Sequence, residues 1–374
     1  MKKIVFLLTL LLLAVTVRAA DIKIGANKEL IVEGKPLFLL YTYGPQREFA
    51  YLKSLGMNCV PASDETQAKN FTNEMCFAEA KRLGLYTSCS ISDFDKVNKN
   101  DPTLIMWDQT DEPDYIERDK PGSIKDLIAL YQKAHATDSK PVNVCFGSMF
   151  AAGVGVMKNN LYVEYAEKTA DVVMTDIYPV GNLNKPENLF LMAKAMKNLD
   201  KITKGKKPLM IAVEVTKIDD KAARAANAFE VRAEVWMVII HGAKGIFYFP
   251  ARFDRVRFSP VAIPEDVEAE LIRTNKEITD LTDVILSGNS TAKVDIVESD
   301  TASAAMMLKE KKDKFYLFTI NMKNAPGKLK FTVAGAKGTE AEVYGEGRKV
   351  KIVNGSIEEE YKSYEPHIYV ISKN

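Results

Sequence analysis

Carboxylates gather in one short segment of this sequence, and another stands alone in an apolar run. The segment WDQTDEPD (107–114) holds four Asp or Glu residues in eight positions, directly after an apolar stretch. Farther along the chain, Glu214 interrupts the apolar run IAVEV. Burying an unpaired carboxylate costs on the order of several kcal/mol, so Glu214 needs a partner or a chemical role. If Glu112 and Glu214 approach to about 5 to 5.5 Å, one can attack an anomeric carbon while the other protonates the leaving oxygen, as in retaining glycoside hydrolysis.

Other interpretations of these residues stay open. The segment 107–114 lacks the alternating ligands and central glycine of an EF-hand loop, which disfavours a calcium site and leaves a solvated acidic loop as the alternative. For Glu214 the alternative is a structural salt bridge to a lysine or arginine. The histidines His135, His241 and His367 are far apart in sequence, so a catalytic triad or a histidine-rich metal site has little support. We therefore expect no metal and no other cofactor.

Eight short apolar runs recur between residues 36 and 251, with longer amphipathic stretches such as 122–136 and 227–243 between them. Strands that are apolar on both faces are typical of a parallel sheet covered by helices. Glycines such as Gly56 and Gly84, shortly before the next run, are typical of helix ends. The predicted strands are PLFLLYTYG (36–44), GMNCVPA (56–62), GLYTSCSIS (84–92), TLIMWDQTDE (103–112), PVNVCFG (141–147), DVVMTDIYPV (171–180), KPLMIAVEVTK (207–217) and GAKGIFYFPA (242–251).

Eight βα units within about 250 residues match the size of a (β/α)8 TIM barrel, an α/β fold. A doubly wound open sheet is the alternative, but it would normally carry a glycine-rich phosphate turn after its first strand, and YTYGPQRE is not one. We assign residues 20–287 to the barrel and expect the hairpin ELIVEGKPLF, with its turn at Glu33 and Gly34, to cover the barrel bottom. Residues 288–374 alternate apolar and polar side chains between turns, which predicts a small all-β antiparallel sandwich.

Residues 1–19 read as a cleavable signal peptide. Two lysines precede the apolar run IVFLLTLLLLAV, and Val17 and Ala19 put small residues at the cleavage positions. A span needs about 20 apolar residues, and neither this run nor any later one reaches that length. We therefore expect a secreted or periplasmic protein without an integral membrane segment after cleavage.

Composition narrows the range of partners. The chain has 51 basic and 50 acidic residues, a net charge of +1, so no overall field favours nucleic acid or an anionic membrane.

The cysteines lack C-x-x-C spacing, which disfavours a zinc site. We expect them to be small buried apolar residues, with a disulfide between neighbouring strands as the alternative; they are Cys59, Cys76, Cys89 and Cys145. Nothing in the sequence predicts the oligomeric state.

The active site of a (β/α)8 barrel lies at the C-terminal ends of its strands, the barrel mouth, where strands four and seven face one another. Glu112 and Glu214 end these two predicted strands. Aromatic rings at the mouth suit a carbohydrate, because sugars stack their C–H faces on them, although half of these rings could instead be barrel core. The candidate substrate-binding residues at strand ends are Asp111, Tyr178, Tyr43, Arg47, Asp176, Tyr248 and Phe249, with Tyr41 and Trp107 as further aromatics.

The surroundings of the two glutamates suggest their roles. A general acid must be protonated near neutral pH, and the neighbours Asp111 and Asp114 should raise the pKa of Glu112. Glu214 must stay ionised to act as a nucleophile, and the hydroxyl of Tyr178 on the adjacent strand is expected to hold it.

Together, the glutamates ending strands four and seven, the opening ELIVEGKPLFLLYTYG, the IYP segment (177–179) and GAKGIFYFP (242–250) resemble clan A, the 4/7 superfamily, of the retaining glycoside hydrolases. The resemblance covers the barrel, and FTINMKN with YEPHIYVIS is similar to the β-sandwich that often follows it. It implies that Glu112 is the acid/base, Glu214 the nucleophile, Tyr178 the hydrogen-bond partner of that nucleophile, and a carbohydrate the substrate.

The sequence departs from the pattern of the clan at one position. An asparagine usually precedes the acid/base glutamate and helps to hold the sugar 2-hydroxyl, whereas this chain has Asp111. An ionised aspartate only accepts hydrogen bonds, so recognition at the sugar 2-position is expected to differ. Two other functions on the same barrel remain as alternatives: a non-catalytic carbohydrate-binding protein, which would not need both glutamates, and a metal-dependent hydrolase.

Overall fold

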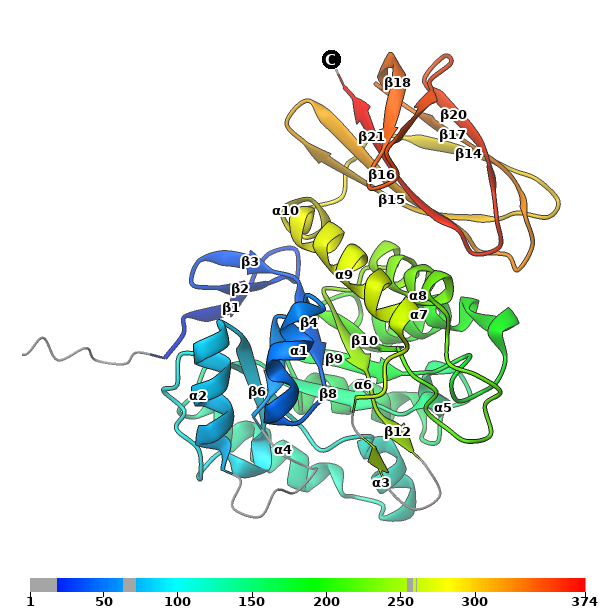
Figure 1. The fold of residues 1–374 in the computed structure, drawn as a ribbon. Coiled ribbons are helices and arrows are strands. Elements are labelled where there is room, and N and C mark those ends of the chain that lie inside the picture. The colour runs from blue at the N-terminus through cyan, green and yellow to red at the C-terminus, as the bar shows by residue number, and fades with distance from the viewer. Residues whose placement is uncertain (1–18, 63–71, 254–257, 260, 374) are drawn as a thin grey trace, which may run out of the picture.

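A closed barrel of eight parallel strands forms the first part of the protein (Figure 1). The computed structural model describes residues 19–62, 72–253, 258–259 and 261–373. Each predicted apolar run contains one barrel strand, which confirms the (β/α)8 interpretation over an open sheet. The strands are β4 (Leu39–Thr42), β5 (Cys59–Pro61), β6 (Tyr86–Ser90), β7 (Leu104–Asp108), β8 (Val142–Phe146), β9 (Val172–Asp176), β10 (Leu209–Glu214) and β11 (Gly245–Phe249).

Helices surround the barrel, as the amphipathic stretches predict. The predicted helix 227–243 is α8, which begins with a capping box between Asn227 and Glu230. The described helices are α1 (Phe49–Ser54), α2 (Asn73–Leu83), α3 (Pro113–Asp119), α4 (Ile124–His135), α5 (Ser148–Ala151), α6 (Asn159–Lys168), α7 (Phe190–Thr203), α8 (Ala228–Ile240), α9 (Glu265–Asp280) and α10 (Thr282–Ile285), with 3-10 turns η1 (Gln46–Glu48), η2 (Ile91–Asp93) and η3 (Pro186–Asn188).

A small antiparallel sheet covers the bottom of the barrel, as predicted. It consists of β1 (Ile22–Ile24), β2 (Leu30–Val32) and β3 (Lys35–Leu37). The turn between β2 and β3 has positive φ at both Glu33 (50°) and Gly34 (76°), the combination that a tight two-residue hairpin requires. Apolar side chains of β1 and β2 pack in one cluster with Leu39 and Met210 of the barrel interior, so this sheet closes the end opposite the mouth.

The C-terminal part is an antiparallel β-sandwich of two sheets, ordered β14-β17-β20 and β15-β16-β21-β18-β19. The predicted boundary near Gly288 lies between α10 and β14. A short ribbon, β12 (Arg252–Phe253) and β13 (Phe258–Ser259), follows the last barrel strand. The sandwich strands are β14 (Val294–Glu298), β15 (Ala304–Lys311), β16 (Lys314–Asn321), β17 (Gly327–Val333), β18 (Lys337–Val343), β19 (Arg348–Lys351), β20 (Ser356–Tyr361) and β21 (Pro366–Ser372).

Helix α8 joins the barrel and the sandwich in one core. It lies between them and is buried from Glu230 to Ile240, including the ionisable side chains Arg232 and Glu234. Trp236 of α8 stacks on Phe318 of β16, with ring centroids 5.9 Å apart and planes 30° apart. Both side chains are buried, so the two parts should unfold together.

Replacing Trp236 by Ala should therefore cost about 3 to 5 kcal/mol of unfolding free energy, as expected for a large aromatic removed from a core. Chemical denaturation followed by circular dichroism measures this loss. Phe190→Ala on α7 is the control, because Phe190 is 42% exposed. A loss equal to that of the control, or separate transitions for barrel and sandwich, would contradict the shared core.

Two further findings concern the whole described chain. All four cysteines are buried and free, which confirms the apolar interpretation and not the disulfide. In the residues that the structure describes, no helix has the length and apolar character needed to span a membrane. The predicted signal peptide falls almost wholly in residues 1–18, outside the described part.

Candidate active site at the barrel mouth

Glu112 stands at the mouth, four residues beyond the end of β7, as the N-cap of α3. Its backbone has φ 43° and ψ 53°, the left-handed region, and its N–H donates to the carbonyl of Cys145 at 3.0 Å. A non-glycine residue in this conformation costs about 1 to 3 kcal/mol, and such strain is concentrated at functional sites. Pro113 then starts the helix, where its missing N–H is not needed.

Close packing around Glu112 fixes the position of its carboxyl group. A Cβ atom at Gly147 would lie 2.8 Å from Oε1 of Glu112 and 2.2 Å from the ring of Tyr115, so only glycine fits at the end of β8. The buried Asp114 accepts hydrogen bonds from the Gly147 N–H at 3.0 Å and the Tyr162 hydroxyl at 3.1 Å. Asp114 thereby ties the start of α3 to β8 and is a structural support of the site.

The protonation of Glu112 matches that of a general acid. Partial burial, together with the charges of Asp111 and Asp114, raises the pKa of Glu112 to about 7. The predicted rise is thus confirmed, and burial is its main cause. A carboxyl group with this pKa is partly protonated at neutral pH and can donate a proton to a leaving group.

Asp176, at the end of β9, is the acidic neighbour of Glu112. Burial raises the pKa of Asp176, and the charges of Glu112 and Asp111 raise it further, while a hydrogen bond from Tyr178 lowers it. Within the described part of the chain, Oδ1 of Asp176 is buried without a hydrogen-bond partner. Asp111, Glu112 and Asp176 together form what we call the mouth cluster, and three of the predicted site residues therefore lie together.

Aromatic rings form one wall of the mouth. Tyr178 packs against Phe249 at 5.3 Å between ring centroids, and Phe249 stacks on Phe253 at 5.8 Å with planes 26° apart. Phe253 is 51% exposed. The sequence predicted Tyr178 and Phe249 at the mouth. Phe253 was missed because it lies beyond the last strand, although the aromatic residue in PARFD could have indicated it.

Below the mouth the barrel interior holds a polar network that the sequence analysis did not identify. Asp108 of β7 accepts a hydrogen bond from the Tyr41 hydroxyl at 2.9 Å and from the Asn143 amide at 3.2 Å. Ser88 donates to the same tyrosine oxygen at 2.6 Å. Tyr41 is therefore part of the barrel interior and supports the floor of the site.

Glu214 has different surroundings from those predicted. It has the same parity along β10 as Met210 and Ala212, which lie in the clusters of the barrel interior, so its side chain points inward. Its carboxylate accepts hydrogen bonds from the backbone N–H groups of Val180, at 2.7 Å, and Gly181, and the residue is 0% exposed. A Cβ at Gly181 would lie 2.7 Å from Oε2 of Glu214, so glycine permits this close approach.

One expectation about Glu214, its hydrogen bond with Tyr178, is corrected. Tyr178 does not hold it, because the hydroxyl of Tyr178 bonds Asp176 and backbone amides take its place. Burial raises the pKa of Glu214 despite those amides, and the buried Glu234 of α8 is its close acidic neighbour. Among described residues no hydrogen bond joins Glu112 to Glu214, and their catalytic pairing stays a prediction.

Two other predicted residues, Tyr248 and Trp107, point away from the mouth, whereas the roles of Tyr43 and Arg47 stay predictions. Tyr248 points outward between Phe247 and Phe249, and its hydroxyl donates to Asn275 of α9 at 2.7 Å, so it is not at the mouth. Strand alternation is the physical reason. Trp107 also points outward, donating its indole N–H to Asp138 at 3.1 Å. Tyr43 is partly buried, and Arg47 is exposed beside Glu48.

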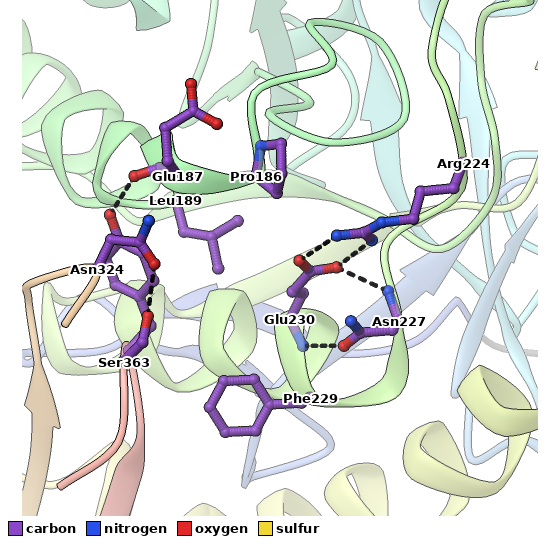
Figure 2. A pocket seen from close by; sticks show the side chains of 10 residues that line it. Pro186, Glu187, Leu189, Arg224, Asn227, Phe229, Glu230, Asn324 and Ser363 are labelled. Atoms are coloured by element: carbon purple, nitrogen blue, oxygen red, sulfur yellow. Dashed lines mark hydrogen bonds and ion pairs between the residues drawn. The ribbon is translucent and has the colours of Figure 1, made fainter. Parts of the chain in front are cut away.

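A hollow of about 440 Å³ lies between the loops after β9 and β10 and the sandwich (Figure 2). On its barrel side, Arg224 and Glu230 form a two-pronged ion pair at 2.6 and 2.7 Å. The Tyr364 hydroxyl of the sandwich donates to the Glu187 carbonyl at 2.6 Å. These contacts hold the loops after β9 and β10 in place. The charge of Glu230 contributes to the raised pKa of Glu214.

Replacing Asp111 by Asn should lower the pKa of Glu112, because it removes the nearest charge that disfavours ionisation. The alkaline limb of the pH–rate profile should then move to lower pH. Asp220→Asn is the matched control, since this aspartate pairs with Arg252. An unchanged alkaline limb in Asp111→Asn would show that the limb does not report Glu112.

Metal ligation has no support in the described part of the chain, where no three His, Cys, Asp or Glu side chains are grouped to hold an ion.

The fold of this chain, although not its sequence, is similar to that of solved structures. No protein-family model matches the chain, and neither does any curated protein. A GH30 endoxylanase from Clostridium papyrosolvens aligns with TM-score 0.52 and 12% identity over 95% of this chain and 100% of its own. A trehalulose synthase mutant in complex with Tris aligns with TM-score 0.54 and 10% identity over 89% of this chain and 99% of its own. The chain therefore shares its fold with an endoxylanase and a trehalulose synthase.

Proposed function

We propose that this chain is a retaining glycoside hydrolase that acts on β-linked oligo- or polysaccharides, with Glu112 as its acid/base residue. The observation that carries the proposal is the placement of Glu112, partly exposed at the barrel mouth with a pKa of about 7. In the adjacent aromatic wall, Tyr178 is buried behind Phe249, and the exposed Phe253 offers a face on which a sugar can stack. The resemblance to clan A and the shared barrel fold agree with this assignment.

In the proposed mechanism, Glu112 donates a proton to the leaving glycosidic oxygen while Glu214 attacks the anomeric carbon. Glu112 then removes a proton from the water that releases the sugar. The side chain of Glu214 points inward at the end of β10, which supports its role. Its bonds to the Val180 and Gly181 amides must open for attack, since the residue is fully buried.

The full burial of Glu214 favours a second candidate function, that of a non-catalytic carbohydrate-binding protein. Such a protein would use the aromatic wall and the polar groups of the mouth cluster without a nucleophile. Glu214 would then serve only to hold the loop at Val180 and Gly181.

Hydrolysis of defined glycosides separates the two functions. The wild-type protein is incubated with aryl β-glycosides and with plant, algal and host-glycan oligosaccharides, and released sugar is measured. Proton NMR during the first turnovers shows whether the product keeps the anomeric configuration. Sugar release with retention supports the proposal; inversion refutes double displacement, and saturable binding without release indicates the carbohydrate-binding function.

We also propose that the protein is exported, on the basis of its N-terminal sequence. Cleavage after Ala19 would make Ala20 the first residue of the mature chain. N-terminal sequencing of protein recovered from the periplasm or the medium tests this; an intact Met1 on protein from the cytoplasm would refute it.

A further inference from the structure

A cleft of about 530 Å³ lies between the barrel and the sandwich, on the side away from the mouth. The end of α8 and the turn into β11 line it on the barrel side, and the segment after α10 and strand β15 line it on the sandwich side. The turn 241–244 precedes β11, so the cleft is near the N-terminal ends of the barrel strands. Small-molecule sites typically have volumes of about 300 to 1,000 Å³, a range that includes this cleft.

Three lysines line this cleft: Lys28, Lys244 and Lys309. Lys309 of β15 is 2% exposed, and its ammonium group donates to the Ser287 carbonyl at 2.5 Å. Burial, together with the charge of Lys244, lowers the pKa of Lys309 to about 8. Burial likewise lowers the pKa of Lys244, and Lys28 adds to that effect. Lys244 therefore has a neighbouring like charge on each side, Lys309 and Lys28.

These lysines lack a matching negative charge. Among described residues none of them forms an ion pair with a carboxylate, in contrast to the buried Lys140, which pairs with Asp138 at 3.1 Å. Glu29 favours the charged form of Lys244 without pairing with it, and Asp200 lies exposed at the edge of the cleft. A buried charge without a partner is strongly unfavourable, so an anion between these groups would stabilise them.

We propose that this cleft binds a small oxyanion, a phosphate or sulfate group, between Lys309 and Lys244 with Lys28 at its edge. The ammonium group of Lys309 keeps donors beyond the one used by Ser287, because a lysine carries three. The cleft is larger than one phosphate, so it has room for a small sugar that carries such a group. The site is separate from the mouth and does not depend on the glycosidase proposal.

Isothermal titration calorimetry with inorganic phosphate at pH 7 and low chloride tests the proposal. Lys309→Met and Lys244→Met keep side-chain length and remove the charge, and Lys351→Met is the control because Lys351 is exposed and carries the same charge. We expect saturable binding by the wild type and the control, and affinity at least tenfold weaker in both cleft variants. Absence of saturable binding by the wild type, or equal affinity in Lys309→Met, would overturn the site.

Lys309→Met is also expected to fold at least as stably as the wild type without phosphate, because an unpaired buried charge is replaced by an apolar chain of similar length. Thermal unfolding with and without phosphate then gives a second readout, in which phosphate raises the Tm of the wild type more than that of Lys309→Met. Equal rises would indicate a general salt effect and refute specific binding. Titration with glucose 6-phosphate distinguishes a sugar phosphate, which would bind more tightly than phosphate, from the free ion.

Discussion

Replacing Glu112 by Gln is expected to lower glycoside turnover by about 10²- to 10⁴-fold, the usual contribution of a general acid–base group. The amide keeps the shape of the side chain but cannot donate a proton to the leaving oxygen. The loss should be smaller for aryl glycosides with acidic leaving groups, which need little protonation to depart. Comparing kcat for an activated aryl glycoside and for an oligosaccharide measures this difference.

The pH profile of the wild type gives an independent check. Because the acid form of Glu112 is the active one, activity should fall as pH rises through its pKa of about 7. The fall should approach tenfold per pH unit, since each unit reduces the protonated fraction tenfold. Glu360→Gln, an exposed glutamate on the sandwich, is the control and should leave rate and profile unchanged. Full activity in Glu112→Gln would eliminate Glu112 as the acid.

Replacing Glu214 by Ala is expected to remove activity at least as completely as Glu112→Gln, because the covalent intermediate can no longer form. Azide should restore part of the activity by occupying the vacated space, giving a glycosyl azide of inverted configuration. The variant also leaves the Val180 and Gly181 N–H groups without their acceptor, at a cost of about 1 to 3 kcal/mol each, so its folding must be verified by circular dichroism.

Asp176→Asn is the comparison that makes this test decisive, since Asp176 is the carboxylate beside Glu112. If Glu214 is the nucleophile, azide rescues Glu214→Ala and has no effect on Asp176→Asn or Asp176→Ala. Rescue of Asp176→Ala with near-normal activity in a folded Glu214→Ala would transfer the role to Asp176 and refute the predicted pair.

Much of the fold follows from local patterns in the sequence. Doubly apolar runs of strand length separated by amphipathic helices predicted the eight barrel strands, and two-residue alternation predicted the sandwich. The direction of the pKa shift of Glu112 was also accessible, because Asp111 and Asp114 are sequence neighbours, although its main cause, burial, depends on the fold. The hairpin turn at Glu33 and Gly34 belongs to the same class of local features.

The tertiary structure decided which way side chains point and what surrounds them. In a strand that is apolar on both faces the sequence does not show which face is inward, so Tyr248 was expected at the mouth yet contacts α9. Asp176 meets Glu112, and Glu214 meets the amides of Val180 and Gly181, only because separate loops fold over the barrel end.

The sequence by itself therefore determined the barrel, the sandwich and the acidic neighbours of Glu112, because these depend on periodicity and on adjacent residues, whereas the burial that chiefly raises the pKa of Glu112 came from the tertiary structure. The surroundings of Glu214 and the grouping of three lysines beneath the barrel were decided by tertiary structure. Lys28, Lys244 and Lys309 are far apart in sequence, and they reach one cleft only because the N-terminal hairpin, the barrel and the sandwich pack together.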